Sequence, residues 1–374
     1  MPDWYKLDNA AKIYAPVLNS RWTPMFRLSV DLTEEVDPVI LAEAQKRTLK
    51  RFPTFATTLK RGLFWFYLDN VEGQPPIQED IFNPLQPLNF HKNNGFMYRI
   101  LYYKKRIAIE YFHSLADGTG AMTFLLTMVS EYLHICHGIE IEQNGFIKDV
   151  RDEPDPEESE DAFLRYCEKK SIGISEPPSY QFRTTPVPDN RTLITTGIID
   201  TRKLRDLAKS YDCTIGEFTG SLLLWCALQV WKQDTRKSKN RRMVKVSIPV
   251  NLRRFFPSKT VRNFSAFVDP GLFGNVGDYT LEEVISYTKN FIKLNTEPKL
   301  LKAKFSYNVA AEKNPFIRIT PLFLKIPVLQ LVYWFAGDLN YATTISNLGL
   351  ITLPESINKY VGRIDFMLGR ARRS

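Results

Sequence analysis

The chain has few residues of the two kinds that most often bind metals, with four cysteines and four histidines among 374 residues. The cysteines show no close metal-type spacing and lie in apolar or helical surroundings, as expected of reduced thiols inside a cell. Residues 1–7 lack the basic and then apolar pattern of a signal peptide. We therefore expect a cytoplasmic location, no bound metal and no structural disulfide from the four cysteines, Cys136, Cys167, Cys213 and Cys226.

The chain also lacks a long uninterrupted apolar run. The longest candidate, residues 319–336, contains two prolines, a lysine and a glutamine. A membrane-spanning helix needs about 20 mostly apolar residues. The run therefore predicts a buried helix, and we expect no membrane insertion.

The composition predicts a well-packed globular protein, because 44% of its residues are hydrophobic and 13% are aromatic. At this length two domains can each bury a core. The net charge is +9, and its densest cluster is Arg236–Arg242. That cluster is either a solvated surface loop or a binding site for an anionic partner. No nucleic-acid-binding motif accompanies the charge, so we expect no nucleic-acid partner.

The middle of the chain carries the signs of a linker. Residues 152–161 are acidic and interrupted by prolines, and they are too charged for burial to be expected. Four more prolines follow between residues 177 and 188. We place the domain boundary near residue 180, which divides the chain into residues 1–180 and 181–374.

The two halves show a weak similarity of pattern. In the first half, a predicted strand at 26–31 ends in aspartate and leads to a predicted helix at 38–50. In the second half, a predicted strand at 193–200 ends in aspartate and leads to a predicted helix at 203–210. Such strand–helix pairs are common, and they indicate an α/β architecture in both halves.

One histidine stands in a setting typical of a catalytic residue. Residues 106–112 alternate as a strand does, and residues 121–133 are apolar enough for a packed helix. Between them lies a His-x-x-x-Asp-Gly loop with His113, Asp117 and Gly118. A neutral imidazole with a pKa near ~6.5 can accept a proton from an attacking alcohol or amine. The alternative is a satisfied structural histidine.

Asp117 is better placed to fix the loop than to relay a proton. It follows His113 by four residues across a tight turn. We expect its carboxylate to form an ion pair with an arginine and to accept hydrogen bonds from nearby backbone N–H groups. Gly118 and Gly120 would let the backbone turn and approach another segment closely.

Three further segments carry motifs, one before this loop in the chain and two after it. They are Arg51-Phe52-Pro53-Thr54-Phe55, Ser247-Ile248-Pro249-Val250-Asn251-Leu252-Arg253 and Thr343-Thr344-Ile345-Ser346-Asn347-Leu348-Gly349. With these motifs the chain resembles the chloramphenicol acetyltransferase-like superfamily, which includes alcohol O-acetyltransferases, polyketide-associated acyltransferases and condensation domains of peptide synthetases. The nearest resemblance is to bacterial alcohol O-acetyltransferase-type proteins. It implies an α/β fold of two similar subdomains, with the active-site channel between them.

Two features depart from the family pattern. Many members have two consecutive histidines, and Phe112 stands at the first position here. This argues mildly against a condensation domain, since the second histidine is the base. The chain also stops soon after a predicted strand at 363–369, where relatives usually continue. We interpret the second subdomain as truncated or as a short form of the family.

The resemblance implies acyl transfer from a thioester to a hydroxyl group. His113 would accept the acceptor's proton and return it to the departing thiolate, with no covalent acyl-enzyme. Acetyl-CoA or another acyl-CoA would be the co-substrate, an alcohol or other small hydroxyl compound the acceptor, and no cofactor would be permanently bound.

The resemblance also assigns roles to other residues. Arg51 is the first choice and Arg21 the second for the partner of Asp117. Ser346 and Asn347 are candidate oxyanion donors, although Ser, Asn and Gly also favour ordinary turns. Asn251 would support the channel. The candidates for binding coenzyme A phosphates are arginines of two loops, Arg241, Arg242, Arg253, Arg254 and Arg262.

Two alternatives stay open. One is a condensation-like enzyme that takes its acyl group from an acyl carrier protein and forms an amide or a lipid ester. The other is a non-catalytic member that acts as a binding module. We expect a monomer, because the family fold places its site within one chain.

Overall fold

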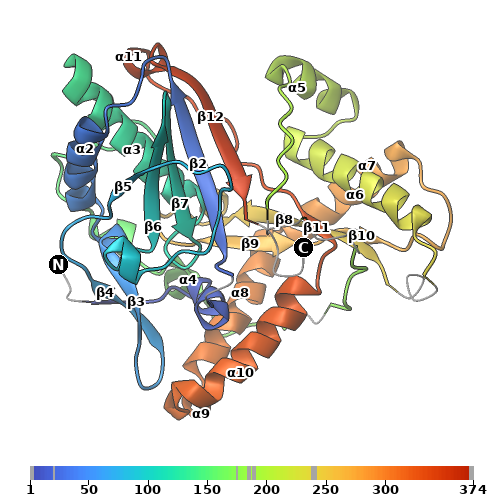
Figure 1. Ribbon diagram of the computed structural model, residues 1–374. Coiled ribbons are helices and arrows are strands. Elements are labelled where there is room, and N and C mark those ends of the chain that lie inside the picture. Colours follow the sequence, from blue (N-terminus) through green and yellow to red (C-terminus); the bar gives the residue numbers. More distant parts are fainter. Residues whose placement is uncertain are drawn as a thin grey trace.

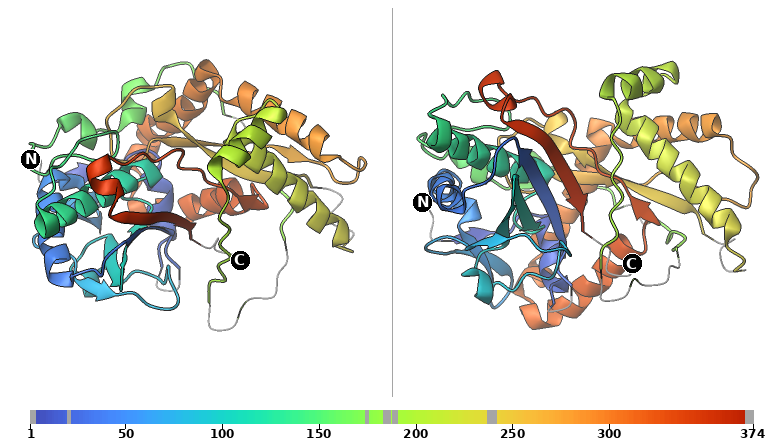
Figure 2. Two further views of the ribbon diagram at one scale, coloured as in Figure 1. Left: turned by 90° about the horizontal axis from the view of Figure 1, so that it is seen from above. Right: turned by 45° about the horizontal axis from the view of Figure 1, so that its top comes forward.

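The computed structural model describes residues 4–19, 22–173, 176–182, 187, 191–236 and 242–369. The described chain forms two main sheets, each with helices packed against it, and a smaller sheet beside the first (Figure 1). Figure 2 shows the same two bodies from above and from an inclined view. The observed mixture of helices and strands confirms the predicted α/β class.

The first sheet has five strands in the order β12-β2-β7-β6-β5. Its pairs are antiparallel except β5–β6, which is parallel. The strands are β12 (Val361–Leu368), β2 (Met25–Leu32), β7 (Arg106–Phe112), β6 (Tyr98–Tyr103) and β5 (Ile77–Glu79). The last strand of the described chain therefore lies in the sheet of the first half, against β2.

The second sheet is built around one strand, β8 (Val244–Asn251). β10 (Gly271–Leu272) and β9 (Ser265–Val268) pair with it antiparallel, and β11 (Thr343–Thr344) pairs with it parallel. A three-stranded sheet beside the first one has the order β1-β4-β3. Its strands are β1 (Trp4–Lys6), β4 (Phe66–Asn70) and β3 (Thr57–Arg61).

The helices cover the outer sides of these sheets (Figure 1). α3 packs against β2 and β7 and against α2, whereas α6 packs against β8 and α7. The helices are α1 (Ala11–Tyr14), α2 (Pro38–Arg51), α3 (Gly118–His137), α4 (Ala162–Tyr166), α5 (Thr201–Ser210), α6 (Ile215–Gln233), α7 (Leu281–Asn295), α8 (Pro298–Lys313), α9 (Pro315–Ile319), α10 (Leu322–Tyr333) and α11 (Glu355–Asn358).

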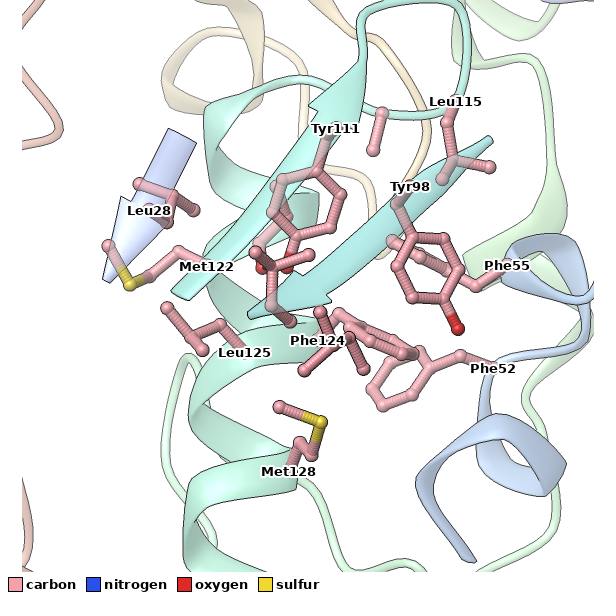
Figure 3. Packing of buried hydrophobic residues seen from close by; sticks show 14 of the residues in the cluster. Leu28, Phe52, Phe55, Tyr98, Tyr111, Leu115, Met122, Phe124, Leu125 and Met128 are labelled. Atoms are coloured by element: carbon pink, nitrogen blue, oxygen red, sulfur yellow. The ribbon is translucent and has the colours of Figure 1, made fainter. Parts of the chain in front are cut away.

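Aromatic side chains form much of the core between α3 and the first sheet (Figure 3). Phe124 of α3 stacks on Phe55 with ring centroids 4.4 Å apart, and Tyr98 meets Phe124 edge to face at 5.3 Å. Tyr111 of β7 donates from its hydroxyl to the carbonyl of Ala121, at 3.0 Å. These contacts fix α3 relative to the end of β7.

Several predicted elements are confirmed. The strand at 106–112 is β7, and the strand at 26–31 and the helix at 38–50 correspond to β2 and α2. The helix predicted at 121–133 is α3, which is longer at both ends because Asp117 caps it and Gly138 ends it in the left-handed region, at φ 65°.

Three expectations were wrong. Residues 193–200 are extended and exposed but pair with no strand in the described part of the chain. Within the predicted exposed linker, Glu158 is buried, because Arg51 neutralises it. The run at 319–336 contains the last residue of α9 and all of α10, and many of its large apolar side chains are exposed rather than buried. The boundary near residue 180 stays a prediction.

No single helix of the described ranges is long and apolar enough to cross a bilayer. The pair α5 and α6 passes the same test together, but the two helices meet at an angle of 77°.

Candidate active site

The His113 loop continues the sheet pairing beyond the end of β7. The backbone N–H of His113 donates to the carbonyl of Pro24, at 2.9 Å, and that of Leu115 donates to Phe112 at 2.9 Å. α3 then begins at Gly118. The predicted arrangement of strand, tight loop and helix is present, and it delivers the imidazole at the end of a central strand.

Aromatic rings enclose the imidazole of His113. Tyr14, the last residue of α1, stacks on it with centroids 4.5 Å apart and planes 19° from parallel. Phe26 of β2 lies at 5.0 Å. The Nδ1 atom is buried and has no hydrogen-bond partner among the described residues. Packing against these rings therefore holds the imidazole in place.

Burial lowers the pKa of His113, because the charged imidazolium loses hydration in this aromatic setting. Its own backbone, the Asp117 carboxylate, the Asn263 side chain and Asp8 oppose that shift in part. The lowered pKa favours the neutral imidazole, which is the state that a general base needs.

Phe112, which replaces the first histidine of the family pattern, belongs to the core. Its side chain is fully buried, and its ring packs against Phe90 with centroids 5.7 Å apart. The substitution therefore changes packing beneath the loop and leaves His113 in place.

Asp117 fixes the loop, and every partner it has is structural. Its Oδ1 accepts from the N–H of Gly120 at 3.1 Å, which caps α3. Its Oδ2 accepts from Arg253 NH1 at 2.7 Å and from the N–H of Phe264 at 2.9 Å. The carboxylate thereby joins the loop of the first half to two segments of the second.

The arginine that pairs with Asp117 is Arg253, which the sequence analysis had assigned to coenzyme A. Besides Asp117, its guanidinium donates to the Thr260 carbonyl from Nε and NH2, to the Arg262 carbonyl from NH2, and to Asn251 Oδ1 from NH1. A guanidinium has five N–H donors, and all five are engaged here. Arg253 is therefore a positioning residue and has no donor left for a phosphate.

Arg51 does not reach Asp117, contrary to the prediction. Its Nη1 and Nη2 atoms form a bidentate ion pair with the Glu158 carboxylate, at 2.5 and 2.9 Å. Arg51 ends α2, so this pair joins that helix to the loop at 156–159. The second choice, Arg21, lies outside the described residues.

The other predicted phosphate-binding arginines differ in exposure. Arg262 is buried, donates to the carbonyl of Lys6 at 2.5 Å and lies 3.6 Å from Asp8, so it is also unavailable to a phosphate. Arg254 and Arg242 are exposed. Arg242 lies just before β8, at the far end of that strand from Asn251, and Arg241 lies outside the described residues.

Asn251 lies where the second half meets the His113 loop. It ends β8, its Nδ2 donates to Thr119 Oγ1 at 3.1 Å, and its Oδ1 accepts from the N–H of Arg253 at 3.1 Å. The structure thus brings two of the sequence motifs together, with Asn251 supporting the residue that follows Gly118.

The Ser346-Asn347 loop follows β11 and approaches the start of α3. A Cβ atom on Gly118 would lie 2.6 Å from Leu348 Cδ2, so the two loops are in contact. Asn347 is exposed, and its Oδ1 accepts from the N–H of Gly349 at 2.8 Å, as in an ordinary turn. Their role as oxyanion donors stays a prediction.

Sequence reasoning missed the side chains that surround the imidazole. Tyr14, Phe26 and the buried pair Asp8–Asn263, whose side chains lie 3.3 Å apart, carry no motif and come from distant segments. The sequence did contain one signal of a close contact at this loop, namely its second glycine, Gly120. The structure leaves no room for a side chain at that position. A Cβ there would lie 1.8 Å from the Val261 carbonyl oxygen.

A cavity of 650 Å³ lies between α2 and β4, lined by residues that include Lys46, Lys50 and Asn70. None of its lining residues belongs to the His113 loop or to the segments that contact it. We therefore do not assign it to the candidate active site.

In comparisons of sequence, no protein-family model and no curated protein matches this chain. Solved structures do match in fold. Polyketide synthase associated protein 5 from Mycobacterium tuberculosis superposes with a TM-score of 0.57 at 11% identity, covering 98% of this chain and 87% of that one. TRI101 of F. graminearum, solved with coenzyme A and deoxynivalenol, has a TM-score of 0.59 at 10% identity, covering 98% and 89%.

A third match is the starter condensation domain of rhizomide synthetase, in a mutant form solved with C8-CoA and Leu-SNAC. Its TM-score is 0.55 at 13% identity, covering 98% of this chain and 83% of that one. The resemblance drawn from the motifs is confirmed at the level of fold. The described chain has the mixed α/β fold of these solved structures, among them a condensation domain and a protein solved with coenzyme A.

Proposed function

We propose that this protein transfers an acyl group from a coenzyme A thioester to a hydroxyl acceptor, with His113 as the general base. The observation that carries the proposal is the state of that imidazole. Aromatic rings enclose it, burial lowers its pKa, and its Nδ1 has no hydrogen-bond partner among the described residues, while Asp117 and Arg253 pair with each other. A shared fold with proteins solved with coenzyme A or acyl-CoA supports the choice of donor.

The reaction needs one proton carrier and no covalent intermediate on the protein. The imidazole accepts the hydroxyl proton while the acceptor oxygen forms a bond to the thioester carbonyl carbon. The resulting tetrahedral intermediate breaks its carbon–sulfur bond, and the imidazolium gives its proton to the thiolate. The products are an ester and free coenzyme A, and His113 is neutral again.

The remaining residues would serve this step by placement. Asp117, Gly118, Asn251 and Arg253 would hold the loop, and Ser346 or Asn347 would donate to the oxyanion. Arg242 and Arg254 are the exposed arginines left to meet the phosphates of coenzyme A. An acetyl donor and a small alcohol acceptor are our first choice within this reaction.

The test is release of free thiol from acetyl-CoA and longer acyl-CoAs across a panel of alcohols and amines. We expect acceptor-dependent release by the wild type and a loss of about 10²–10⁴-fold in His113→Ala. His91→Ala, which removes an exposed histidine, is the matched control and should keep full activity. Release that is unchanged in His113→Ala would remove His113 as the base.

The same assay separates the alternatives. A condensation-like enzyme would release thiol from an acyl carrier protein and not from acyl-CoA, and it would prefer amines in the panel. A non-catalytic member would release none from either donor although the protein is folded. Similarity to a condensation domain is the observation that keeps the first alternative in the panel.

A further inference from the structure

α9, α10 and the hairpin that joins β3 to β4 lie at the lower end of the molecule in Figure 1, and their exposed side chains form an apolar surface. We call it the α9–α10 surface. Its six most prominent side chains are 53–77% exposed, namely Phe316, Ile319, Phe323, Leu324, Val328 and Leu331. Leu63 at the tip of the hairpin is 71% exposed.

The hairpin and α10 form one continuous surface. The N–H of Leu322 donates to the carbonyl of Leu63 at 2.8 Å. The neighbouring Phe64 is 41% exposed, and its carbonyl accepts from Lys325 of α10 at 2.9 Å. The exposed residues of the two elements are therefore held side by side.

The distribution of polar and apolar side chains on α10 is the reverse of that on a surface helix of a water-soluble protein. Its two polar side chains bond inward, Lys325 to the Phe64 carbonyl and Gln330 to the Pro16 carbonyl at 2.8 Å. Lys325 is 6% exposed, and its Nζ lies 3.8 Å from the centre of the Trp65 ring. The outward residues are apolar. A surface helix normally shows the opposite pattern, so this face calls for an apolar partner.

The two segments that carry this surface contain basic residues and no acidic ones. Residues 314–337 and 56–68 contain no aspartate or glutamate. They do contain the exposed cations Lys60, Arg61 and Arg318, for which no ion pair exists within the described ranges. An apolar face bordered by cations is complementary to an anionic lipid surface.

A second copy of the chain fits this face less well. A symmetric dimer through it would bring the cations of one copy close to the same cations of the other, with no carboxylate in these segments to compensate them. A bilayer supplies both an apolar layer and anionic headgroups. α10 has 12 residues, which is too short to span a bilayer but sufficient to lie within its interface.

We propose that the α9–α10 surface docks this protein on the anionic face of a lipid bilayer, with α9, α10 and the hairpin tip lying in the interface. The protein is bound at the surface and does not span the membrane.

The surface lies one helix away from the candidate active site. The inner side of α10 packs on α1 and on the short 3-10 helix η1 (Ala15–Val17). Tyr333 at the end of α10 meets Tyr14 edge to face with centroids 6.5 Å apart, and Tyr14 stacks on His113. Given the acyl transfer proposed above, this placement suits an acceptor or acyl chain that partitions into membranes.

Co-sedimentation with vesicles tests the proposal without any need for catalysis. The full chain is mixed with vesicles of phosphatidylcholine alone and with vesicles that also contain phosphatidylglycerol, in about 0.1 M and about 1 M salt. We expect binding to the anionic vesicles, weakened by the higher salt. A failure to bind would overturn the docking proposal and leave the acyl-transfer assay, which uses no vesicles, unaffected.

Substitutions locate the binding face. Phe323→Glu should lower binding about tenfold or more, since a large apolar side chain would lose its place in the interface. Arg318→Gln should lower binding to anionic vesicles about fivefold. Val39→Glu, an equally exposed apolar position on α2, is the matched control and should bind as the wild type does.

Thermal unfolding confirms that each variant is folded before binding is compared. Equal binding by wild type and Phe323→Glu would overturn the proposal. So would a dimer in sedimentation velocity that Phe323→Glu dissociates, because the face would then be covered by a second copy.

Discussion

The two halves of the chain pack their apolar residues differently. In the first half, one continuous core joins the five-stranded sheet to α2 and α3. Most buried apolar residues of the second half fall into three smaller clusters, and large apolar side chains of α9 and α10 are exposed. The first half is organised around one large apolar core, whereas the second consists of smaller packed units.

This difference assigns different tasks to the two halves at the candidate site. His113 comes from the end of β7, a central strand whose placement is fixed by the larger core. The second half contributes supports, among them Arg253, Asn251 and the N–H of Phe264. Geometry at an active site must be held within about 0.5 Å, and rigid elements achieve this best. The contacts between the halves should therefore matter more to activity than the second half's own cores.

The ion pairs of two arginines, the buried Arg51 and the partly buried Arg253, give the largest expected effect. Arg253 joins the halves through Asp117, whereas Arg51 pairs with Glu158 away from the loop. Removing one member of a buried ion pair costs about 3–5 kcal/mol, so Arg253→Gln and Arg51→Gln should both lower the free energy of unfolding. Only Arg253→Gln should also lower kcat, by roughly 10²-fold, because the loop would move.

The measurement pairs thiol-release kinetics with chemical denaturation, each normalised to the folded fraction. Equal activities of the two folded variants would show that the contact between the halves does not position the loop.

Gly120 tests the close approach of the halves at the same point. A Cβ there would lie 1.8 Å from the Val261 carbonyl oxygen, whereas a Cβ on Gly145 would meet nothing within 4 Å. Gly120→Ala should therefore destabilise the fold by about 1–3 kcal/mol through overpacking, and Gly145→Ala should leave it nearly unchanged. Denaturant titrations of both variants measure this, and similar midpoints would contradict the described contact.

The pH dependence of activity tests the core around His113. Burial lowers the pKa of this imidazole below its usual value. Since the base acts in its neutral form, kcat/KM should rise with pH, reach half its maximum below about pH 6.5 and be flat near pH 7. A half-maximum above that value would show that the ring is solvated or paired with a carboxylate, unlike the packed state described here.

The smallest expected effect concerns a buried acid of the second half. Burial raises the pKa of Asp269 to about 6, above its usual 3.8. The folded state then binds its proton more tightly than the unfolded state, so this group costs stability as the pH rises from about 4 through about 6. Asp269→Asn should remove that cost and keep the hydrogen bond that Asn340 donates from its Nδ2, because aspartate and asparagine both offer a side-chain oxygen as acceptor.

Thermal unfolding of wild type and Asp269→Asn between about pH 4 and about pH 7 measures the difference in Tm. The Tm of the variant should increase relative to that of the wild type as the pH rises. A constant difference in Tm would mean that Asp269 is ionised in both states over this range.

Much of the His113 region could be predicted from the sequence, because its signals are local. The alternation at 106–112 requires a strand, and the loop that follows carries its own helix cap in Asp117. The prediction that Asp117 forms an ion pair with an arginine was correct in kind and wrong in partner. Arg253 lies 136 residues further along the chain, and no local pattern distinguishes it from Arg51.

Exposure could not be predicted in the same way. Residues 193–200 have the pattern of a strand, but a strand also needs a partner, and the described chain offers none there. The apolar run at 319–336 predicted burial, since apolarity favours removal from water whatever the partner. Whether other segments cover such apolar residues depends on the arrangement of the whole molecule, so their exposure is seen only in the tertiary structure.

The sequence by itself determined the α/β class, the strand–loop–helix that carries His113 and the order of the family motifs, since alternation, capping and turn chemistry act over a few residues. The tertiary structure alone decided that Arg253 supports Asp117, that Tyr14 and Phe26 enclose the imidazole, and that α10 faces outward. These outcomes depend on which distant segments come into contact, and contact energies between distant segments are a property of the folded chain.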